Sequence, residues 1–529
     1  MKKLLCIWVF CLVGLFGATS LGAEEQQDQA ASMSGTMGTV TIDGKQWQRL
    51  NFRPEIPIGK FGIALDIELF IDSQGRFNKK GWDFSTGAAS TESLLRKIYY
   101  LRYGHPGDNL FLKVGALDNV SLGYGLIMEG YCNTLEYPGV KKLGLQFGLD
   151  GLTPFRIGAE GIVASFQDFR HKGGLIGLRV FGRPVVSTEV PLLSKLTVGA
   201  TYVTDINQYS GLEDSDGDGY PDKCDAFPRD RKRWLDSDGD GIEDQSDIDD
   251  DGDNILDADY ENYPQYCPFD SATVDALQGV VPFPLDSVVT RKSLFEHGPA
   301  DAFSMVGFDV GLPILEKAAM RLDLYGQYAR VLDDSDGDTA EGYGIAAPGL
   351  RFTLSPLVAK IEYRHCRGHF IPGYFNRLYE QTRARVSDGS VQTGDSTLDS
   401  TDTNGVFGEL RAELGKFVSL SANYQYLTGK GGSSKRQQSF SAQGYVLSGI
   451  LDLVPRISHV SAYYQKTRIN TKEYRFFEPT PETLCGYKLG MEVSSGMSVV
   501  WHTQYTYTTD VNGEVKSQKL VSIETTMTF

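Results

Sequence analysis

Apolar and polar residues alternate along most of the chain, from residue 61 to the last residue. In 61–72 one face holds the apolar residues Ile63, Leu65, Ile67, Leu69 and Ile71, and the other face includes Ala64, Asp66, Glu68 and Asp72. The same period of two recurs in 142–150 and 405–414. Because a strand directs successive side chains to opposite faces, each segment has one apolar and one polar face. These segments run nine to twelve residues, which exceeds the usual strand of a soluble sandwich and suits a tilted crossing of a bilayer.

Eighteen such segments are found, and sixteen or twenty strands would fit the same pattern. They lie near residues 61–72, 96–103, 110–118, 141–150, 155–166, 174–183, 195–205, 301–311, 320–331, 343–354, 357–365, 405–415, 417–427, 439–450, 456–468, 484–494, 497–508 and 518–529. Their connections alternate between tight turns, such as Ser355-Pro356, and long loops, such as 366–404. This is the arrangement of outer-membrane barrels, with short periplasmic turns, longer extracellular loops and an even strand number. The pattern predicts an all-β protein, a transmembrane antiparallel β-barrel over 61–529 in outer-membrane lipid with both termini periplasmic.

The last strand supports this prediction. Val521, Ile523, Thr525, Met527 and Phe529 share one face, and Phe529 is the last residue. A terminal Phe after alternating apolar positions resembles the assembly signal of bacterial outer-membrane barrels. Tyr and Trp near segment ends, among them Tyr202 and Trp501, fit an interfacial aromatic girdle.

The N-terminal part of the chain contains a predicted export signal and a segment that precedes the predicted barrel. Residues 1–23 have the basic start, apolar run and small-residue cleavage site of a secretory signal peptide. Residues 24–60 contain a predicted hairpin with its turn at Asp43-Gly44, followed by Pro54 and Pro57. We expect this segment to be periplasmic, preceding the barrel or plugging it.

The charge is concentrated in one insertion. The chain carries 51 basic and 68 acidic residues, a net charge of −17. Residues 212–259 hold nineteen acids and five bases, a net of −14, which leaves −3 for the rest. An acidic chain argues against nucleic acid as a partner, since phosphate binding needs a basic face.

Within this insertion, three runs have the spacing of calcium loops. Carboxylates at positions 1, 3, 5, 9 and 12 and a carbonyl at position 7 can surround one Ca²⁺, with Gly at position 6 for the sharp turn. The first run supplies Asp214, Asp216, Asp218, Tyr220 (carbonyl), Asp222 and Asp225. The second supplies Asp236, Asp238, Asp240, Ile242 (carbonyl), Asp244 and Asp247. The third supplies Asp249, Asp251, Asp253, Ile255 (carbonyl) and Asp257, but has Asn254 at position 6 and Tyr260 at position 12, so we expect a weaker site.

The spacing of the runs excludes EF-hands. The runs begin 22 and 13 residues apart with Pro221 and Pro228 between the first two, which leaves no room for flanking helices. Tandem runs of this kind over 212–260 resemble thrombospondin type 3 repeats. The resemblance implies calcium binding, an extracellular location and a role in adhesion or as a spacer. Because those repeats carry paired cysteines, it also implies a disulfide between Cys224 and Cys267. We place the repeats in an extracellular loop insertion over 206–300.

No catalytic constellation stands out, and we expect the protein not to be an enzyme. The one metal-like spacing among the histidines is His365-Cys366-x-x-His369. We interpret it as ordinary rim residues where the long loop 366–404 begins, rather than as a metal site. No serine lies in a nucleophile-elbow setting.

Two functions therefore remain. The first is a porin-like channel for small hydrophilic solutes, because a barrel of about eighteen strands is wide enough for an aqueous lumen. Loop 366–404 is long enough to fold inward as a constriction, and folding outward is equally compatible with its sequence; its aromatic and basic residues are Phe370, Tyr374, Phe375, Arg377, Arg383 and Arg385. The alternative is a membrane-anchored surface adhesion or structural protein, whose calcium-stiffened module binds a surface glycan or protein partner.

Overall fold

The computed structural model describes most of the chain between residues 32 and 527. The described residues are 32–42, 45–77, 93–135, 137, 141–152, 155–171, 173–185, 192–212, 302–317, 319–332, 341–387, 390–429, 436–467, 477–480, 482–509 and 515–527, with isolated residues within 82–90 and 220–243. The predicted signal peptide, the Asp43-Gly44 turn, the Cys224–Cys267 pair and Phe529 lie outside them.

Twenty-one strands form one sheet. They are β1 (Ser32–Ile42), β2 (Lys45–Ile58), β3 (Phe61–Leu65), β4 (Ile67–Ile71), β5 (Ile98–Tyr103), β6 (Leu110–Gly115), β7 (Gly144–Leu152), β8 (Ile157–Val163), β9 (Leu175–Gly182), β10 (Thr197–Asp205), β11 (Phe303–Lys317), β12 (Met320–Val331), β13 (Gly342–Leu354), β14 (Leu357–Gly368), β17 (Thr401–Leu414), β18 (Val418–Gly429), β19 (Arg436–Val446), β20 (Ile457–Lys466), β21 (Thr483–Ser494), β22 (Met497–Thr509) and β23 (Val515–Met527). A separate hairpin pairs β15 (Ala384–Ser387) with β16 (Ser390–Thr393).

The helices whose bounds fall in the described ranges are short and lie in the connections. They are η1 (Asp168–His171), η2 (Leu193–Lys195), η3 (Gln208–Gly211), α4 (Tyr379–Thr382) and α5 (Ser448–Leu451). No helix in the described ranges is long and apolar enough to span a membrane.

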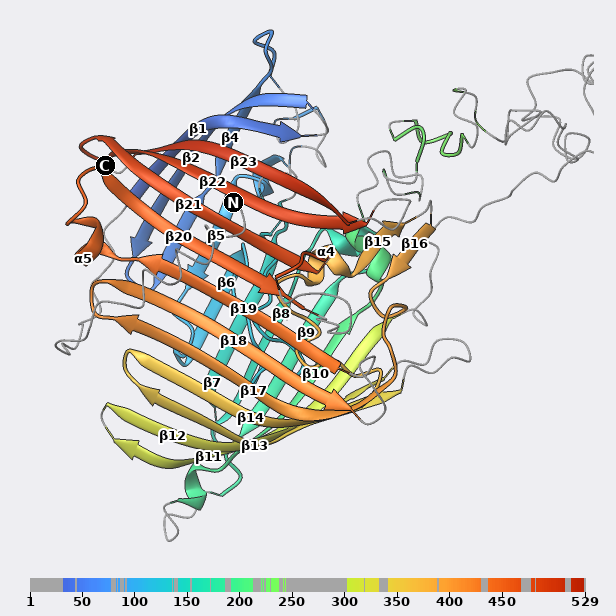
Figure 1. Ribbon diagram of the computed structural model, residues 1–529, viewed down its shortest axis with the longest axis vertical. Coiled ribbons are helices and arrows are strands. Elements are labelled where there is room, and N and C mark those ends of the chain that lie inside the picture. Colours follow the sequence, from blue (N-terminus) through green and yellow to red (C-terminus); the bar gives the residue numbers. More distant parts are fainter. Residues whose placement is uncertain are drawn as a thin grey trace, which may run out of the picture.

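The sheet is an up-and-down meander in which each strand pairs antiparallel with the next (Figure 1). β3 and β4 both pair with β2 and are separated by Asp66, so they act as one interrupted strand. Tight turns such as 355–356 and 495–496 join the strands at one end, here called the short-turn end. Long connections such as 116–143, 206–302 and 369–400 emerge at the other, the long-loop end. The eighteen strands predicted from residue 61 onward are all present.

The predicted boundary at residue 61 is wrong, because the sheet begins at residue 32. The hairpin expected in 24–60 forms, with Ile42 paired to Lys45, but β2 continues to Ile58 and pairs with β3 and β4. Pro57 suggested that no strand continues to this point. It lies beyond the part of β2 that pairs with β1, so its missing N–H removes no hydrogen bond from the β1–β2 ladder. With the interrupted strand counted once, β1 and β2 raise the number of barrel strands to twenty.

The first and last strands lie side by side, which brings the meander round on itself (Figure 1). A side chain at Gly38 of β1 would collide with the backbone of Ile523 in β23. Inside the barrel, Arg49 of β2 reaches past β1 to Glu524 of β23, with Nη1 3.1 Å from Oε1. Arg49 Nε also donates to Glu68 Oε1 at 2.8 Å. A buried guanidinium thus bridges the two sides of the closure.

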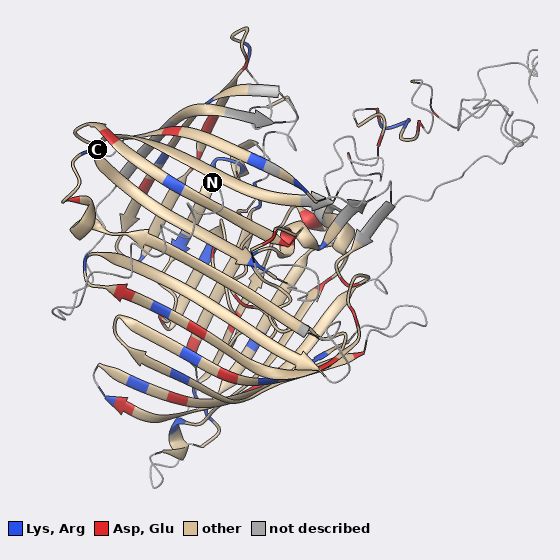
Figure 2. Ribbon diagram, viewed as in Figure 1, with Lys and Arg blue, Asp and Glu red and all other residues tan. Residues whose placement is uncertain are grey.

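Side chains alternate as the sequence indicated. On β14 the apolar face is exposed at Ile361, while the neighbouring Glu362 and Arg364 are buried inside. Val521 and Ile523 are likewise exposed on the outside of β23. Buried charged residues such as Glu362 and Arg364 therefore line the interior. Figure 2 shows where charged residues occur along the strands. The fold is an antiparallel transmembrane β-barrel with an apolar exterior and a polar lumen.

The closure cluster can be tested by replacing Arg49 with methionine. The change removes one of the two cations that pair with the buried Glu68 and leaves Lys141 as the other, so we expect the free energy of unfolding to fall by about 1.5–3 kcal/mol. The measurement is the fraction of protein that keeps the compact gel mobility of a folded barrel after heating through a temperature series.

Arg330→Met is the matched control, since Arg330 is half exposed and pairs with the exposed Glu341 at 3.2 Å. It should change the stability by less than about 1 kcal/mol. Equal unfolding of Arg49→Met and the wild type would show that the bridge does not stabilise the closure.

Candidate functional site

Two long connections fold into the lumen instead of away from it. These luminal loops are 116–143, between β6 and β7, and 369–400, between β14 and β17. They join through the bridge between Met128 and Phe375, where Glu129 N donates to the Phe375 carbonyl at 3.1 Å. Sequence left the direction of the second loop open, and the structure shows the inward one.

The luminal loops are held together by a small hydrophobic core. Met128, Phe370, Phe375 and Tyr379 are all essentially buried, and they contact apolar residues of the surrounding wall such as Phe303. The ring of Phe375 packs edge-on to that of Tyr379, with centroids 4.8 Å apart. Residues expected to form a constriction, Phe370, Tyr374 and Phe375, are therefore the packed interior of a folded obstruction.

Arg383 is the centre of a buried polar cluster at the long-loop end. Its Nη1 donates to Asp168 Oδ2 at 2.6 Å, and its Nη2 donates to Asp205 Oδ1 at 2.9 Å. Nη2 also donates to Ser210 Oγ at 2.8 Å. These partners belong to η1, the end of β10 and η3, so one side chain connects the luminal loop 369–400 with the root of the acidic insertion.

Glu380 extends this cluster to the other luminal loop, since it pairs with Lys142 and accepts from the Tyr131 hydroxyl. Burial alone would raise the pKa of Glu380, but Lys142 and Arg383 outweigh burial and lower the pKa to about 2. A free glutamic acid has a pKa of about 4.3. The stabilisation from this carboxylate is therefore present above about pH 4.3 and is lost as the pH falls toward 2.

Deeper in the lumen, four charged residues lie together where loop 116–143 meets the wall, and this group is here called the charged constriction: Glu129, Lys360, Arg364 and Glu409. Lys360 Nζ donates to Glu129 Oε1 at 3.0 Å and to the Tyr124 carbonyl at 2.6 Å. Arg364 Nη2 lies 3.8 Å from Glu129 Oε2, and Glu409 Oε2 lies 3.8 Å from Lys360 Nζ. The wall residues come from β14 and β17, which pair in register at Lys360 and Glu409.

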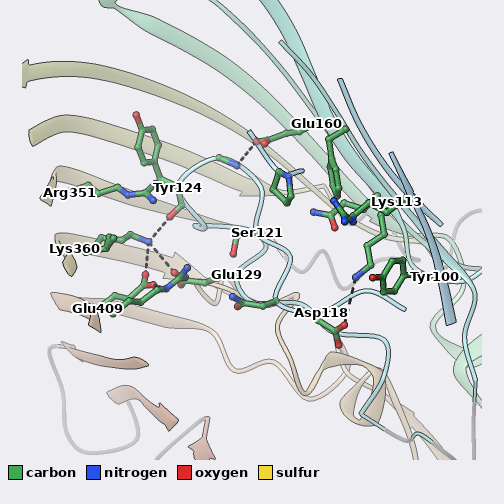
Figure 3. Close-up of a pocket in the computed structure, with 18 residues that line it drawn as sticks. Tyr100, Lys113, Asp118, Ser121, Tyr124, Glu129, Glu160, Arg351, Lys360 and Glu409 are labelled. Carbon is green, nitrogen blue, oxygen red and sulfur yellow. Dashed lines mark hydrogen bonds and ion pairs between the residues drawn. The ribbon is translucent and has the colours of Figure 1, made fainter. Parts of the chain in front are cut away.

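A cavity of about 590 Å³ lies on the short-turn side of the constriction. This lower chamber includes Pro106 of a tight turn in its lining, and Figure 3 shows Lys113, Glu160, Arg351 and Lys360 around it. Half of its lining is ionised, with both signs represented: Arg102, Lys113, Asp118, Glu129, Glu160, Arg351, Lys360, Glu409 and Arg411.

A second cavity of about 250 Å³ lies between loop 369–400 and the wall formed by β17, β18 and β19. This upper chamber includes Thr467 and Glu482 of a long connection in its lining, so it faces the long-loop end. Asn119, Glu129, Glu409 and Arg411 line both chambers. The two cavities therefore meet at the charged constriction, and together they extend along the lumen.

Most of the predicted calcium ligands lie outside the described residues. The described ones are Tyr220, Asp222, Asp225 and Asp236, and no group of three or more metal-ligating side chains occurs among described residues. Gly241 occupies position 6 of the second run with φ of +93°, and its N–H donates to Asp236 Oδ2 at 3.0 Å. Tyr220 stacks on Trp234 with centroids 5.1 Å apart, which brings the first run close to the start of the second.

The His365-Cys366-x-x-His369 spacing does not form a metal site. Cys366 is buried in the luminal core. His365 precedes it on the same strand and therefore faces the other way, where its ring centroid lies 6.0 Å from that of Tyr343. Among the described cysteines, Cys132 and Cys366 are free thiols.

The alternation in the predicted strands 357–365 and 405–415 puts Lys360, Glu362, Arg364, Glu409 and Arg411 on their polar faces. Sequence reasoning missed Glu129 and the whole inward course of loop 116–143. A signal was present in this loop, because the apolar residues Leu126, Ile127 and Met128 are unusual for a solvent-exposed connection.

The fold and lumen define an outer-membrane-type β-barrel with an internally folded obstruction. No protein-family model and no curated protein matches this sequence. Similar solved structures include Wzi, an outer membrane protein involved in group 1 capsule assembly in Escherichia coli, at 10% identity over 94% of this chain and 84% of that chain, with a TM-score of 0.29. OprD of Pseudomonas aeruginosa is 9% identical over 95% of each chain, with a TM-score of 0.28. The siderophore receptor PirA of Acinetobacter baumannii is 10% identical over 96% of this chain and 81% of that chain, with a TM-score of 0.32. Similarity at this level assigns neither a family nor a function.

The Arg383 cluster predicts that Arg383→Met loosens loop 369–400. Three carboxylates then lose their shared cation, and we expect the local opening free energy to fall by about 3–5 kcal/mol. Arg383→Lys should also fail to hold the loop, because a single ammonium cannot replace a forked guanidinium. Hydrogen exchange of peptides covering 369–400 measures the effect.

Arg367→Met is the control, because Arg367 is exposed on the outer side of β14. It should leave the exchange of this loop unchanged. Unaltered exchange in both Arg383 variants would contradict the assigned role of the cluster.

Proposed function

We propose that the protein is an outer-membrane channel of the porin type, which passes small hydrophilic solutes and is not an enzyme. The observation that carries this proposal is the pair of polar cavities that meet at the charged constriction. Opposite charges face each other across it, so a hydrated solute meets no large net field, and we expect weak ion preference.

The proposed orientation places both termini and the short turns in the periplasm. The long-loop end, with the acidic insertion, then lies at the cell surface. The exposed apolar band, including Ile361 and Val521, contacts outer-membrane lipid.

We further propose that the insertion binds Ca²⁺ through the three acidic runs. The left-handed Gly241 and its bond to Asp236 fit the sharp turn that position 6 of such a loop needs. Bound Ca²⁺ would neutralise carboxylates that otherwise repel one another, so the insertion would be ordered only with the ion present.

The channel predicts discrete conductance steps when the refolded chain is added to planar bilayers in KCl. Glu129→Gln should shift the permeability ratio toward anions, and Lys360→Gln should shift it toward cations. One unit charge at about 4 Å is worth on the order of 1 kcal/mol in water, so each shift should be roughly fivefold. Reversal potentials in a salt gradient measure both.

Lys519→Gln removes a charge from the exposed outer face of β23 and should change neither conductance nor selectivity. Absence of steps from protein with strand-rich spectra and compact gel mobility would reject the channel. Shifts of the same sign in the two lumen variants would reject the charged constriction as its narrowest part.

The calcium proposal predicts that the refolded full chain binds Ca²⁺ in a calorimetric titration, and that Asp236→Asn weakens one class of site. The matched control is Asp334→Asn, because Asp334 begins a similar DSDGD run that lacks an acid at position 9. The control should bind Ca²⁺ as the wild type does. No heat of binding from folded wild-type protein would contradict the proposal.

A further inference from the structure

The wall of the upper chamber differs chemically from that of the lower one. Three adjacent strands, β18, β19 and β20, present uncharged hydrogen-bonding side chains to it. Asn423 pairs across the ladder with Ser441, which in turn pairs with Gln465. In the next row toward the short-turn end, Ser421 pairs with Gln443. The upper chamber therefore has a neutral amide and hydroxyl wall, here called the amide wall: Ser421, Asn423, Ser441, Gln443 and Gln465.

Much of the hydrogen-bonding capacity around this chamber is unused by the protein. Within the described residues, the side chains of Asn423, Ser441 and Gln465 make no hydrogen bond to the protein. Two further lining atoms, Gln437 Oε1 and Arg377 Nε, are buried and have no partner in the described part of the chain. Because buried polar groups are ordinarily hydrogen-bonded, the two buried atoms indicate groups whose partner is a ligand or water. The side chains of Asn423, Ser441 and Gln465 are half-buried and open to the same partner.

The charges that reach the inner end of the chamber are, in contrast, already paired. Arg364 donates to Glu362 at 2.6 Å, and Arg411 lies 2.5 Å from Glu409. Glu129 is held by Lys360. A charged solute at this end would have to break one of these pairs to gain a counter-ion of its own, and breaking a buried pair is costly. On the loop side, Arg377 has no carboxylate partner among the described residues, but its guanidinium lies over the ring of Tyr463.

Loop 369–400 closes the chamber opposite the amide wall. Arg377 Nη1 donates to Gln443 Oε1 at 3.2 Å, which links loop and wall directly. Leu378 packs on Leu484 of β21, next to Tyr463. Ile371 and Phe407 add apolar surface to the lining. The chamber thus offers donors and acceptors on one side and small apolar surfaces on the other.

We infer that the upper chamber binds a neutral polyhydroxylated solute, a sugar of one or two rings, during its passage. Each hydroxyl of such a molecule both donates and accepts, as do the carboxamides of Asn423, Gln443 and Gln465. Its C–H faces suit apolar contacts. The cavity of about 250 Å³ is smaller than the usual site of a drug-sized ligand. We therefore limit the solute to one or two sugar rings. This inference rests on the proposed channel, since it names the solute class of the same lumen.

The test uses maltose as the neutral probe and glucuronate as the charged one. Maltose should interrupt the single-channel current of the wild type and give heat when titrated into the refolded, detergent-solubilised full chain. Glucuronate should do so at least about tenfold more weakly, because the chamber is lined by four acids (Glu129, Asp399, Glu409 and Glu482) against three bases, of which only Arg377 lacks a carboxylate partner among the described residues.

The double variant Asn423→Leu with Gln465→Leu keeps side-chain volume but removes the amides. Loss of two hydrogen bonds should weaken maltose binding by roughly tenfold, while the conductance in KCl alone persists. Gln48→Leu is the matched control, since Gln48 is exposed on β2 and lies away from the chamber. It should bind maltose as the wild type does.

The outcomes separate the inference from the channel itself. Conductance steps without interruption or heat from maltose would overturn the sugar site and leave the channel standing. Heat from maltose without conductance would support the site and reject the channel. Equal or tighter binding of glucuronate, or unchanged maltose binding by the double variant, would overturn the inference.

Discussion

The absence of water in the hydrocarbon layer is the constraint on which the whole structure depends. Backbone N–H and C=O groups that find no water there must pair with one another, so a spanning sheet has to close on itself. Closure assigns one face of every strand to lipid and the other to the interior. A barrel of this size is too wide for its own side chains to fill. Its interior must therefore be wet, or be occupied by another part of the chain.

This protein uses both solutions. The luminal loops 116–143 and 369–400 build a small apolar core inside a polar barrel, and buried ion clusters attach that core to the wall. Arg383 performs this attachment at the long-loop end, and Lys360 with Glu129 performs it near the middle. What remains open is divided into two chambers of different character, one rich in ionised groups and one rich in amides. In the proposed channel, selection by size, by charge and by hydrogen bonding would act in succession.

The strands were predictable because their signal is local. Apolar and polar residues alternate within each segment, and tight turns mark the ends of neighbouring segments. All eighteen strands after residue 61 could therefore be located. The β1–β2 hairpin was recognised as a hairpin, but its place in the barrel was not, because prolines at 54 and 57 argued against a long strand. The direction of a loop depends on contacts between distant residues, such as Tyr131 with Glu380, 249 positions apart. No local pattern contains that information. The amide wall was missed for a related reason, since Asn423 and Gln465 become neighbours only through strand register.

The position of the closure has a consequence for biogenesis. The strands that meet are the first and the last, and the ion pair across them joins Arg49 to Glu524, 475 residues apart. Every other strand pairs with its immediate successor and can do so as soon as that successor is available. The seam alone requires the complete chain, and contacts of such sequence separation form slowly. Until synthesis and export are finished, any partly assembled sheet has two open edges, each able to pair with another strand. Placement of β23 beside β1 is thus the step that ends this vulnerability.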